Sequence, residues 1–219
     1  MTKLFDCFSY WDEDLLLDLR LHILNEYIDF FVIVEGNKTW QNNHKEFRFD
    51  IDKFENFKKK IIYIKVEDMP DGKNPYLREN FQRNCILRGL DNSSKEDLVI
   101  VSDLDEIPNP KCILDFSLSG KRFAAFKQMH FYYKFNLQSK KHPYWYGSRI
   151  CKKNFLKSPQ WLRELKFKKR PFWRLDKLNL NNILENGGWH FCNLKTPNEL
   201  LYKYKNLCET NDQYVFKES

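Results

Sequence analysis

Two aspartates, Asp103 and Asp105, directly follow the apolar run LVIVS at residues 98–102. Such a run predicts a strand covered on both faces, and open α/β sheets bind ligands at the carboxyl ends of their strands. The two carboxylates are therefore expected at such an edge, where hard oxygen ligands suit Mg²⁺ or Mn²⁺. We interpret the pair as holding a divalent ion, whose positive charge attracts the diphosphate of a nucleotide.

The acidic segment DLDE is also compatible with two different roles. It could be an acidic turn that caps a helix predicted at residues 111–116. It could also be the strand-end motif of a haloacid-dehalogenase-type phosphatase, but Ile107 stands where Thr or Val is expected, and no pair of aspartates follows. The position directly after the apolar strand favours the metal-binding interpretation. Nucleotide-sugar transferases need only such metal-holding acids and a wall for the sugar, so sugar transfer is the reaction that this interpretation favours.

Four residues of the first half could bind the nucleotide. Arg78 and Arg83 lie on one predicted helix and could reach phosphate oxygens, which suit the arginine fork; the alternative is a pair of helix-surface interactions. Glu35 ends a predicted buried strand and could bind the nucleoside or its ribose, with Thr39 beside it. The alternative for Glu35 is a charge at the rim of the sheet.

Two further sets of residues could complete the site. His190 follows a glycine pair and could be the third protein ligand of the metal, with Trp189 as a wall for the sugar; the alternative is a histidine buried in the core. A transfer reaction also needs a carboxylate that takes a proton from the acceptor hydroxyl. Glu106 and Glu185 are the candidates for that role.

The elements that must position these residues alternate between strand and helix. Strands are predicted at residues 3–10, 30–35, 60–66 and 98–102, a helix begins after an N-cap at Asp12, and another spans residues 76–90. This order predicts an α/β fold with a mostly parallel sheet and helices on both faces.

The second half of the chain has a different pattern. Residues 123–135 are rich in aromatic side chains and predict one long strand or a hairpin arm, and a final helix is expected at residues 197–208. We expect a single domain over residues 1–219. Residues 1–108 would form its nucleotide-binding half, and residues 109–219 would form its acceptor- and sugar-binding half.

Composition restricts the class of protein. The chain has 219 residues, 42% hydrophobic and 16% aromatic, which is enough for a substantial core. Its six cysteines form no CxxC pair, so a reducing compartment is favoured over a disulfide framework. The first ten residues lack an apolar leader, and no apolar run reaches about 18 residues. We therefore expect a cytoplasmic protein with, at most, peripheral membrane contact.

Positive charge and aromatic side chains gather in the second half. The chain carries a net charge of +7, and residues 152–177 hold ten basic and two acidic residues. This stretch could be a solvated face, but an anionic acceptor, such as a lipid-linked glycan at a membrane surface, is our preferred interpretation. Tyr144, Trp145, Tyr146, Trp161 and Trp173 could form an acceptor platform or, equally, the core of this half.

Four stretches give the chain a specific resemblance to glycosyltransferase family 17. They are FDCFSYWDEDLLLDLRL with FFVIVEGNKT, RENFQRNCILRGL, VSDLDEIPNP and GGWHF. The resemblance implies a GT-A-like, Rossmann-like fold, a UDP-sugar donor (UDP-GlcNAc in known members), Mn²⁺ or Mg²⁺, a glycan acceptor and inversion at the anomeric carbon. The chain departs from the family pattern at residues 10–12 (YWD), at Cys192 and at residues 208–212 (CETND).

Two other classes of function remain open at this point. Positive charge interleaved with aromatic residues is typical of nucleic-acid-binding modules, but that class gives no role to SDLDEIP, so we do not expect nucleic acid as a partner. A catalytically inactive carbohydrate-binding protein of the same fold is the other alternative.

Overall fold

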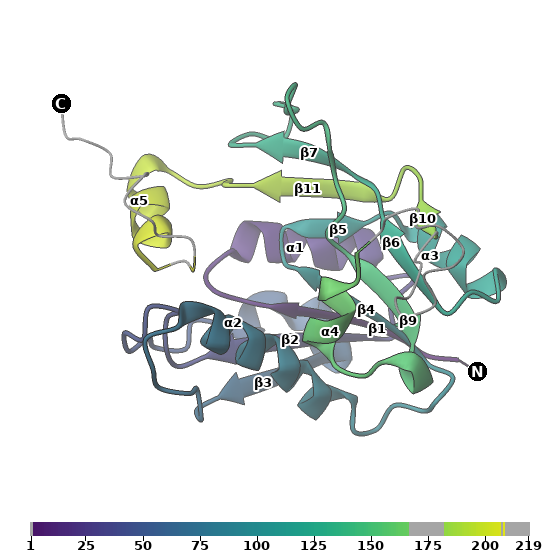
Figure 1. The fold of residues 1–219 in the computed structure, drawn as a ribbon, viewed down its shortest axis with the longest axis horizontal. Coiled ribbons are helices and arrows are strands. Elements are labelled where there is room, and N and C mark those ends of the chain that lie inside the picture. The colour runs from purple at the N-terminus through teal and green to yellow at the C-terminus, as the bar shows by residue number, and fades with distance from the viewer. Residues whose placement is uncertain (1, 167–181, 207, 209–219) are drawn as a thin grey trace, which may run out of the picture.

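A seven-stranded sheet runs through the part of the chain that the computed structural model describes, residues 2–166, 182–206 and 208 (Figure 1). Its strand order is β10-β6-β9-β4-β1-β2-β3. Only β9 is antiparallel to its neighbours among these strands. The strands are β1 (Leu4–Ser9), β2 (Phe30–Gly36), β3 (Ile61–Val66), β4 (Leu98–Asp103), β6 (Phe123–Phe126), β9 (Arg149–Lys152) and β10 (Ile183–Leu184).

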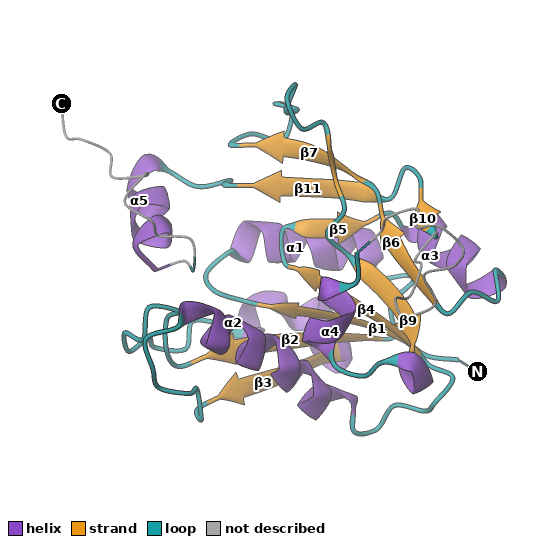
Figure 2. Ribbon diagram, in the orientation of Figure 1, coloured by secondary structure: helices purple, strands orange, loops and turns teal. Residues whose placement is uncertain are grey.

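Helices cover both faces of this sheet, as predicted (Figure 2). Successive strand residues point to opposite faces, so Ile33 packs with one set of helices while Val32 and Val34 pack with the other. The first set is α1 (Asp14–Leu24), the 3₁₀ helix η1 (Ile51–Lys60) and α3 (Pro110–Leu118). The second set is α2 (Pro75–Asn84), the 3₁₀ helix η2 (Cys85–Leu90) and α4 (Pro159–Glu164), with the short η3 (Lys153–Phe155) nearby.

Gly89 lets η2 approach the sheet closely. A Cβ atom at this position would stand 2.4 Å from Cγ1 of Val32 on β2, so any larger residue would push the helix away from the strand. This contact helps to keep α2, which precedes η2 directly, over the carboxyl ends of the central strands.

A second, four-stranded sheet lies beside the first, in the order β5-β11-β7-β8. Its strands are β5 (Glu106–Pro108), β7 (Gln128–Tyr132), β8 (Tyr144–Trp145) and β11 (Gly188–Cys192). β7 and β11 run parallel, and Figure 1 shows both pointing toward α5 (Pro197–Asn206). This four-stranded sheet was not predicted from the sequence.

Most predicted elements of the first half are confirmed within one or two residues, but the structure differs from the predictions at three places in the chain. Asp12 does not cap α1, because the helix begins at Asp14 and Asp12 pairs with Arg48 and Lys195 instead. Residues 123–135 form neither the single long strand nor the hairpin arm that was predicted: residues 123–126 are buried in the large sheet as β6, and the chain then crosses to the small sheet as β7. The predicted helix at 76–90 is α-helical only as far as Asn84.

Cys7, Cys85, Cys112, Cys151 and Cys192 are free thiols, and the first three are buried as expected. Within residues 2–166 and 182–206, no helix has both the length and the apolar character needed to cross a membrane.

Candidate active site

A cavity of about 560 Å³ opens where the carboxyl ends of β1 and β4 face the second sheet. α2 lines one side of it and α5 lines another. The polar and charged groups around it are Ser9, Glu13, Glu79, Gln82, Arg83, Asp103, Asp105, Glu106, His190, Asn193, Lys203 and Asn206. Aromatic side chains complete the wall: Tyr10, Trp11, Trp40, Tyr76, Tyr132, Tyr133, Trp145 and Tyr204.

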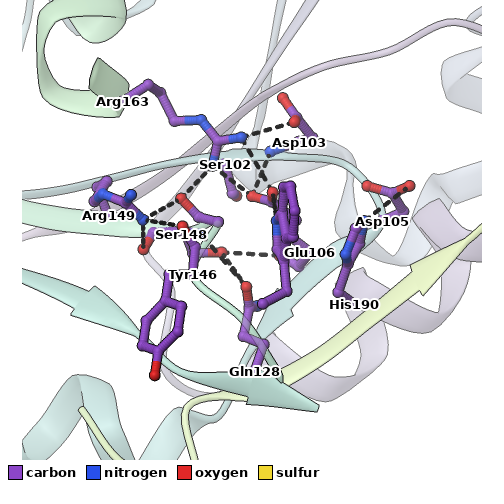
Figure 3. Close-up of polar contacts among 12 residues, drawn as sticks. Ser102, Asp103, Asp105, Glu106, Gln128, Tyr146, Ser148, Arg149, Arg163 and His190 are labelled. Carbon is purple, nitrogen blue, oxygen red and sulfur yellow. Dashed lines mark hydrogen bonds and ion pairs between the residues drawn. The ribbon is translucent and has the colours of Figure 1, made fainter. Parts of the chain in front are cut away.

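Asp103 is the last residue of β4 and pairs with Arg83 and Arg163, and Figure 3 shows the pair with Arg163. Its Oδ1 accepts from Arg83 Nη2 at 3.1 Å, and its Oδ2 accepts from Arg163 Nη2 at 2.7 Å. Burial alone would raise the pKa of Asp103, but the charges of Arg163 and Arg83 outweigh it and lower the pKa. Asp103 is therefore ionised. Its side chain is 42% exposed, so it remains accessible from the cavity.

The side chains of Asp105 and His190 lie next to each other (Figure 3). His190 Nε2 lies 3.6 Å from Asp105 Oδ2, and the amide of Phe191 donates to the backbone oxygen of Asp105 at 2.9 Å, which ties the acidic loop to β11. Burial would raise the pKa of Asp105 and lower that of His190, but attraction between the two outweighs it, so the pKa of Asp105 is lowered and that of His190 is raised. The structure brings these two predicted metal ligands together.

Glu106 is fully buried beneath Asp103, and protein donors occupy its carboxylate. It accepts from Arg163 Nη1 at 2.6 Å, from Trp145 Nε1 at 2.7 Å and from the amide of Asp103 at 3.1 Å. A Cβ atom at residue 147 would stand 1.9 Å from Glu106 Oε1, so the glycine there is needed to admit the carboxylate. These contacts suit a residue that positions the acidic loop, and they do not support the predicted role as a base.

The other predicted base, Glu185, does not line the cavity. It lies in the turn between β10 and β11, its side chain is 65% exposed, and it pairs with Lys127 at 2.8 Å. Its position therefore does not support a catalytic role either.

Glu35, predicted to bind the nucleoside, is also absent from the cavity wall. Its fully buried carboxylate accepts from the ammonium of Lys45, from the amides of Arg48 and Phe49 at 2.8 and 3.0 Å, and from the hydroxyl of Tyr63 at 2.8 Å. Four protein donors leave little capacity for a ligand. Glu35 instead fastens residues 45–49 to β2 and β3.

Thr39 and Arg78 likewise hold loops together. Thr39 Oγ1 accepts from the amide of Asn43 at 3.2 Å within a tight turn. Arg78 is buried and donates to the backbone oxygens of Trp40 and Gly72 at 2.7 and 2.6 Å. Because this guanidinium already joins two loops, the structure does not support phosphate binding by Arg78; of the two predicted arginines, Arg83 is the one that lines the cavity.

Trp189, predicted as a wall for the sugar, is absent from the cavity lining and packs against the hydrophobic core. Trp161 also belongs to the core, with its ring 5.6 Å from that of Phe123.

Tyr144, Trp145 and Tyr146 are exposed, and Trp145 lines the cavity. Trp173 and residues 167–177 of the basic stretch lie outside the described residues.

Three residues of the site, Arg163, Lys203 and Glu13, were not predicted as site residues from the sequence. Arg163 belongs to the basic stretch, yet it turns inward to Asp103 and Glu106 and is only 11% exposed. Lys203 reaches the cavity from α5, and Asp105 and Glu13 raise its pKa against the opposing effect of burial. No local pattern distinguishes these two cations from the many lysines and arginines around them.

Comparison with known proteins shows what the chain is similar to. Residues 1–212 match the family described as glycosyltransferase family 17. Over 104 residues the chain is 31% identical to the human beta-1,4-mannosyl-glycoprotein 4-beta-N-acetylglucosaminyltransferase and 31% identical to its rat counterpart. The mouse protein of the same name is 30% identical. Each match covers 42% of this chain and 19% of the relative, so the matched part spans about a fifth of those proteins.

Proposed function

The chain belongs to glycosyltransferase family 17, and from this premise we propose that it transfers a sugar from a UDP-sugar to a hydroxyl of a glycan acceptor, with the aid of a divalent cation. GlcNAc is the proposed sugar, because the similar mammalian proteins are named as N-acetylglucosaminyltransferases. We further propose a GT-A-type fold, for which the mostly parallel sheet is the support, and inversion at the anomeric carbon. The observation that carries the proposal is the cavity at the ends of β1 and β4, where acids, an imidazole and cations converge.

The donor set suits a hard divalent ion. Asp103, Asp105 and His190 line one cavity, and Asp105 Oδ2 and His190 Nε2 are already 3.6 Å apart. Carboxylate oxygen with imidazole nitrogen is a common set for Mn²⁺, and Mg²⁺ or Mn²⁺ completes its shell with water and phosphate oxygens. When bound, the ion would stabilise the negative charge that grows on the departing nucleoside diphosphate.

Two cations of the chain would share the work on the leaving group. Arg83 on α2 and Lys203 on α5 line opposite parts of the same cavity. Fixed positive charges aimed at the place where negative charge develops are among the largest contributions to catalysis. Lys203 suits this role because it forms no ion pair within the described residues, whereas Arg83 is also engaged by Glu79 and Asp103.

Aromatic rings on the second sheet would orient the sugar rings. Tyr132, Tyr133 and Trp145 line the cavity, and Tyr133 and Trp145 are substantially exposed. The indole of Trp145 is held by its hydrogen bond to Glu106, so its ring presents a fixed face. Rigid aromatic faces give large contact area at low entropic cost, which suits donor and acceptor sugars.

Glu13 is our proposed base in place of Glu106 and Glu185. It lines the cavity, and among the described residues its carboxylate accepts only from the backbone amides of Trp11 and Asp12. Burial raises the pKa of Glu13, although Lys203 and Lys195 oppose the effect. A raised pKa brings a carboxylate closer to the optimum for proton transfer near neutral pH.

Two measurements test the proposed function. Mn²⁺ with UDP should raise the melting temperature, whereas UDP alone or GDP with Mn²⁺ should raise it much less. Release of UDP from a panel of UDP- and GDP-sugars, with and without a glycan acceptor, should then identify the donor. Asp105→Asn should abolish transfer while retaining the fold; substantial transfer by this variant, or by the native protein with excess EDTA, would refute the metal-dependent mechanism.

The two alternatives give different results in the same assays. A nucleic-acid-binding protein would bind oligonucleotides with a steep salt dependence and would not respond to UDP with Mn²⁺. An inactive carbohydrate-binding protein would be stabilised by glycans but would release no UDP.

A further inference from the structure

Three side chains of the second sheet form a cluster in which only His190 has a role in the proposed reaction. His130 on β7 and His190 and Cys192 on β11 each offer a ligand atom, and these atoms lie within 4.8 Å of one another. The two histidines are register partners across the parallel pair of strands, and Cys192 follows His190 by two residues on the same face. The position of the cluster is therefore set by strand pairing rather than by a loop.

The hydrogen bonds around the two rings leave lone pairs inside the cluster. His130 Nδ1 lies 3.2 Å from the backbone oxygen of His142, which can only accept, so Nδ1 donates and Nε2 carries the lone pair. His130 Nε2 is buried and has no hydrogen-bond partner among the described residues. Leaving a buried polar atom unpaired costs about 1–3 kcal/mol, and a bound cation would remove that cost.

His190 is arranged in the complementary way. Its Nε2 faces Asp105 Oδ2 at 3.6 Å, which places the proton of the neutral ring on that nitrogen (Figure 3). Its Nδ1 is buried without a partner among the described residues. Histidines that bind metals usually donate their other N–H to a carboxylate or a backbone carbonyl, and this pair has one of each.

We infer that His130 Nε2, His190 Nδ1 and Cys192 Sγ form a second cation site, selective for a thiophilic divalent ion such as Zn²⁺. Imidazole and thiolate ligands select Zn²⁺ over Mg²⁺ and Mn²⁺, and the site leaves a fourth position for water. Ligand atoms around tetrahedral zinc stand about 3.3–3.6 Å apart, so the side chains must close by about 1 Å. The two rings are stacked 9° from parallel with centroids 4.6 Å apart, so one ring must also turn about its Cβ–Cγ bond.

Occupation of this site has a consequence for the proposed transferase, and this step alone rests on the proposed function. One neutral imidazole cannot supply lone pairs from both nitrogens, so a zinc ion on His190 Nδ1 removes Nε2 as a ligand beside Asp105. The two sites therefore exclude each other through His190. Zn²⁺ should inhibit transfer even when Mn²⁺ is in excess, and a chelator that removes zinc should restore the activity.

Cobalt spectroscopy tests the site without reference to activity. One equivalent of Co²⁺ added to the metal-free, reduced protein should produce a near-ultraviolet thiolate-to-cobalt charge-transfer band and the strong visible bands of four-coordinate cobalt. Zn²⁺ should bleach both. Cys192→Ser should lose the charge-transfer band, and His130→Gln should weaken Co²⁺ binding by more than the roughly 10–100-fold that loss of an outer-shell group costs.

Cys112→Ser is the matched control, because Cys112 is also a free thiol but donates to backbone oxygens of residues 185 and 186. It should keep both bands, and circular dichroism should show that all three variants are folded. Absence of the bands from the native protein, or their persistence in Cys192→Ser, would overturn the site. Intact bands in a protein without transferase activity would leave the zinc site standing and would refute only the proposed function.

Discussion

The buried pair between Arg163 and Glu106 gives a quantitative prediction. The Glu106 side chain is 0% exposed and that of Arg163 is 11% exposed, with Nη1–Oε2 at 2.6 Å and Nη2–Oε1 at 3.1 Å. Arg163→Met keeps most of the apolar stem but leaves a buried carboxylate with two neutral donors, Trp145 and the amide of Asp103. Removing one member of a buried ion pair costs about 3–5 kcal/mol. We expect the free energy of unfolding to fall by that amount.

Arg88→Met is the control for this experiment. Arg88 also binds a carboxylate through two hydrogen bonds, at 2.9 and 2.7 Å from Asp68, but the two side chains are 41% and 60% exposed. Exposed pairs of this kind contribute about 0.2–1 kcal/mol. The substitution is the same at both positions, so the difference between them measures the effect of burial together with that of the second ion pair, which Arg163 forms with Asp103.

Urea unfolding at neutral pH, followed by circular dichroism and tryptophan fluorescence, would measure both changes. Adding Glu106→Gln to Arg163→Met should recover part of the loss, because the uncompensated charge is then gone. Two results would contradict this prediction. One is an Arg163→Met variant whose free energy of unfolding falls no more than that of Arg88→Met, and the other is a double variant that is less stable than Arg163→Met alone.

The surroundings of Glu35, Glu13 and His190 give three further predictions. Glu35→Gln should lower the free energy of unfolding by about 1–3 kcal/mol, while the KM for the UDP-sugar stays unchanged; a raised KM would restore Glu35 to the binding site. Glu13→Gln should lower kcat of transfer by roughly 10²–10⁴-fold with UDP–Mn²⁺ affinity retained, and near-native turnover would exclude Glu13 as the base. Because Asp105 raises the pKa of His190 in the fold, the metal-free protein should lose melting temperature as pH rises from about 6.5 through that pKa, and His190→Gln should not show this loss.

Part of the site could be predicted from local sequence alone. The run LVIVS determines a buried strand, and the residues directly after such a strand must emerge at its carboxyl end, so Asp103 and Asp105 were placed correctly at the cavity. The alternation of strand and helix in the first half was predictable for the same reason, because side-chain periodicity is a property of neighbouring residues. The second half was less predictable: β6 and β7 are adjacent in sequence, but they belong to different sheets.

Only the tertiary structure decided which charged groups are free to act. Glu35, Arg78 and Glu106 are the right residue types for a binding site, but partners from distant segments occupy them. Arg163 looked like one of many surface cations and lies 57 positions from Glu106, yet it completes the pair under the acidic loop. The physical reason is that desolvation and ion pairing depend on what surrounds a group in three dimensions. The sequence determines which residues reach the edge of the sheet. The packed fold determines which of their polar groups are left available to bind a ligand.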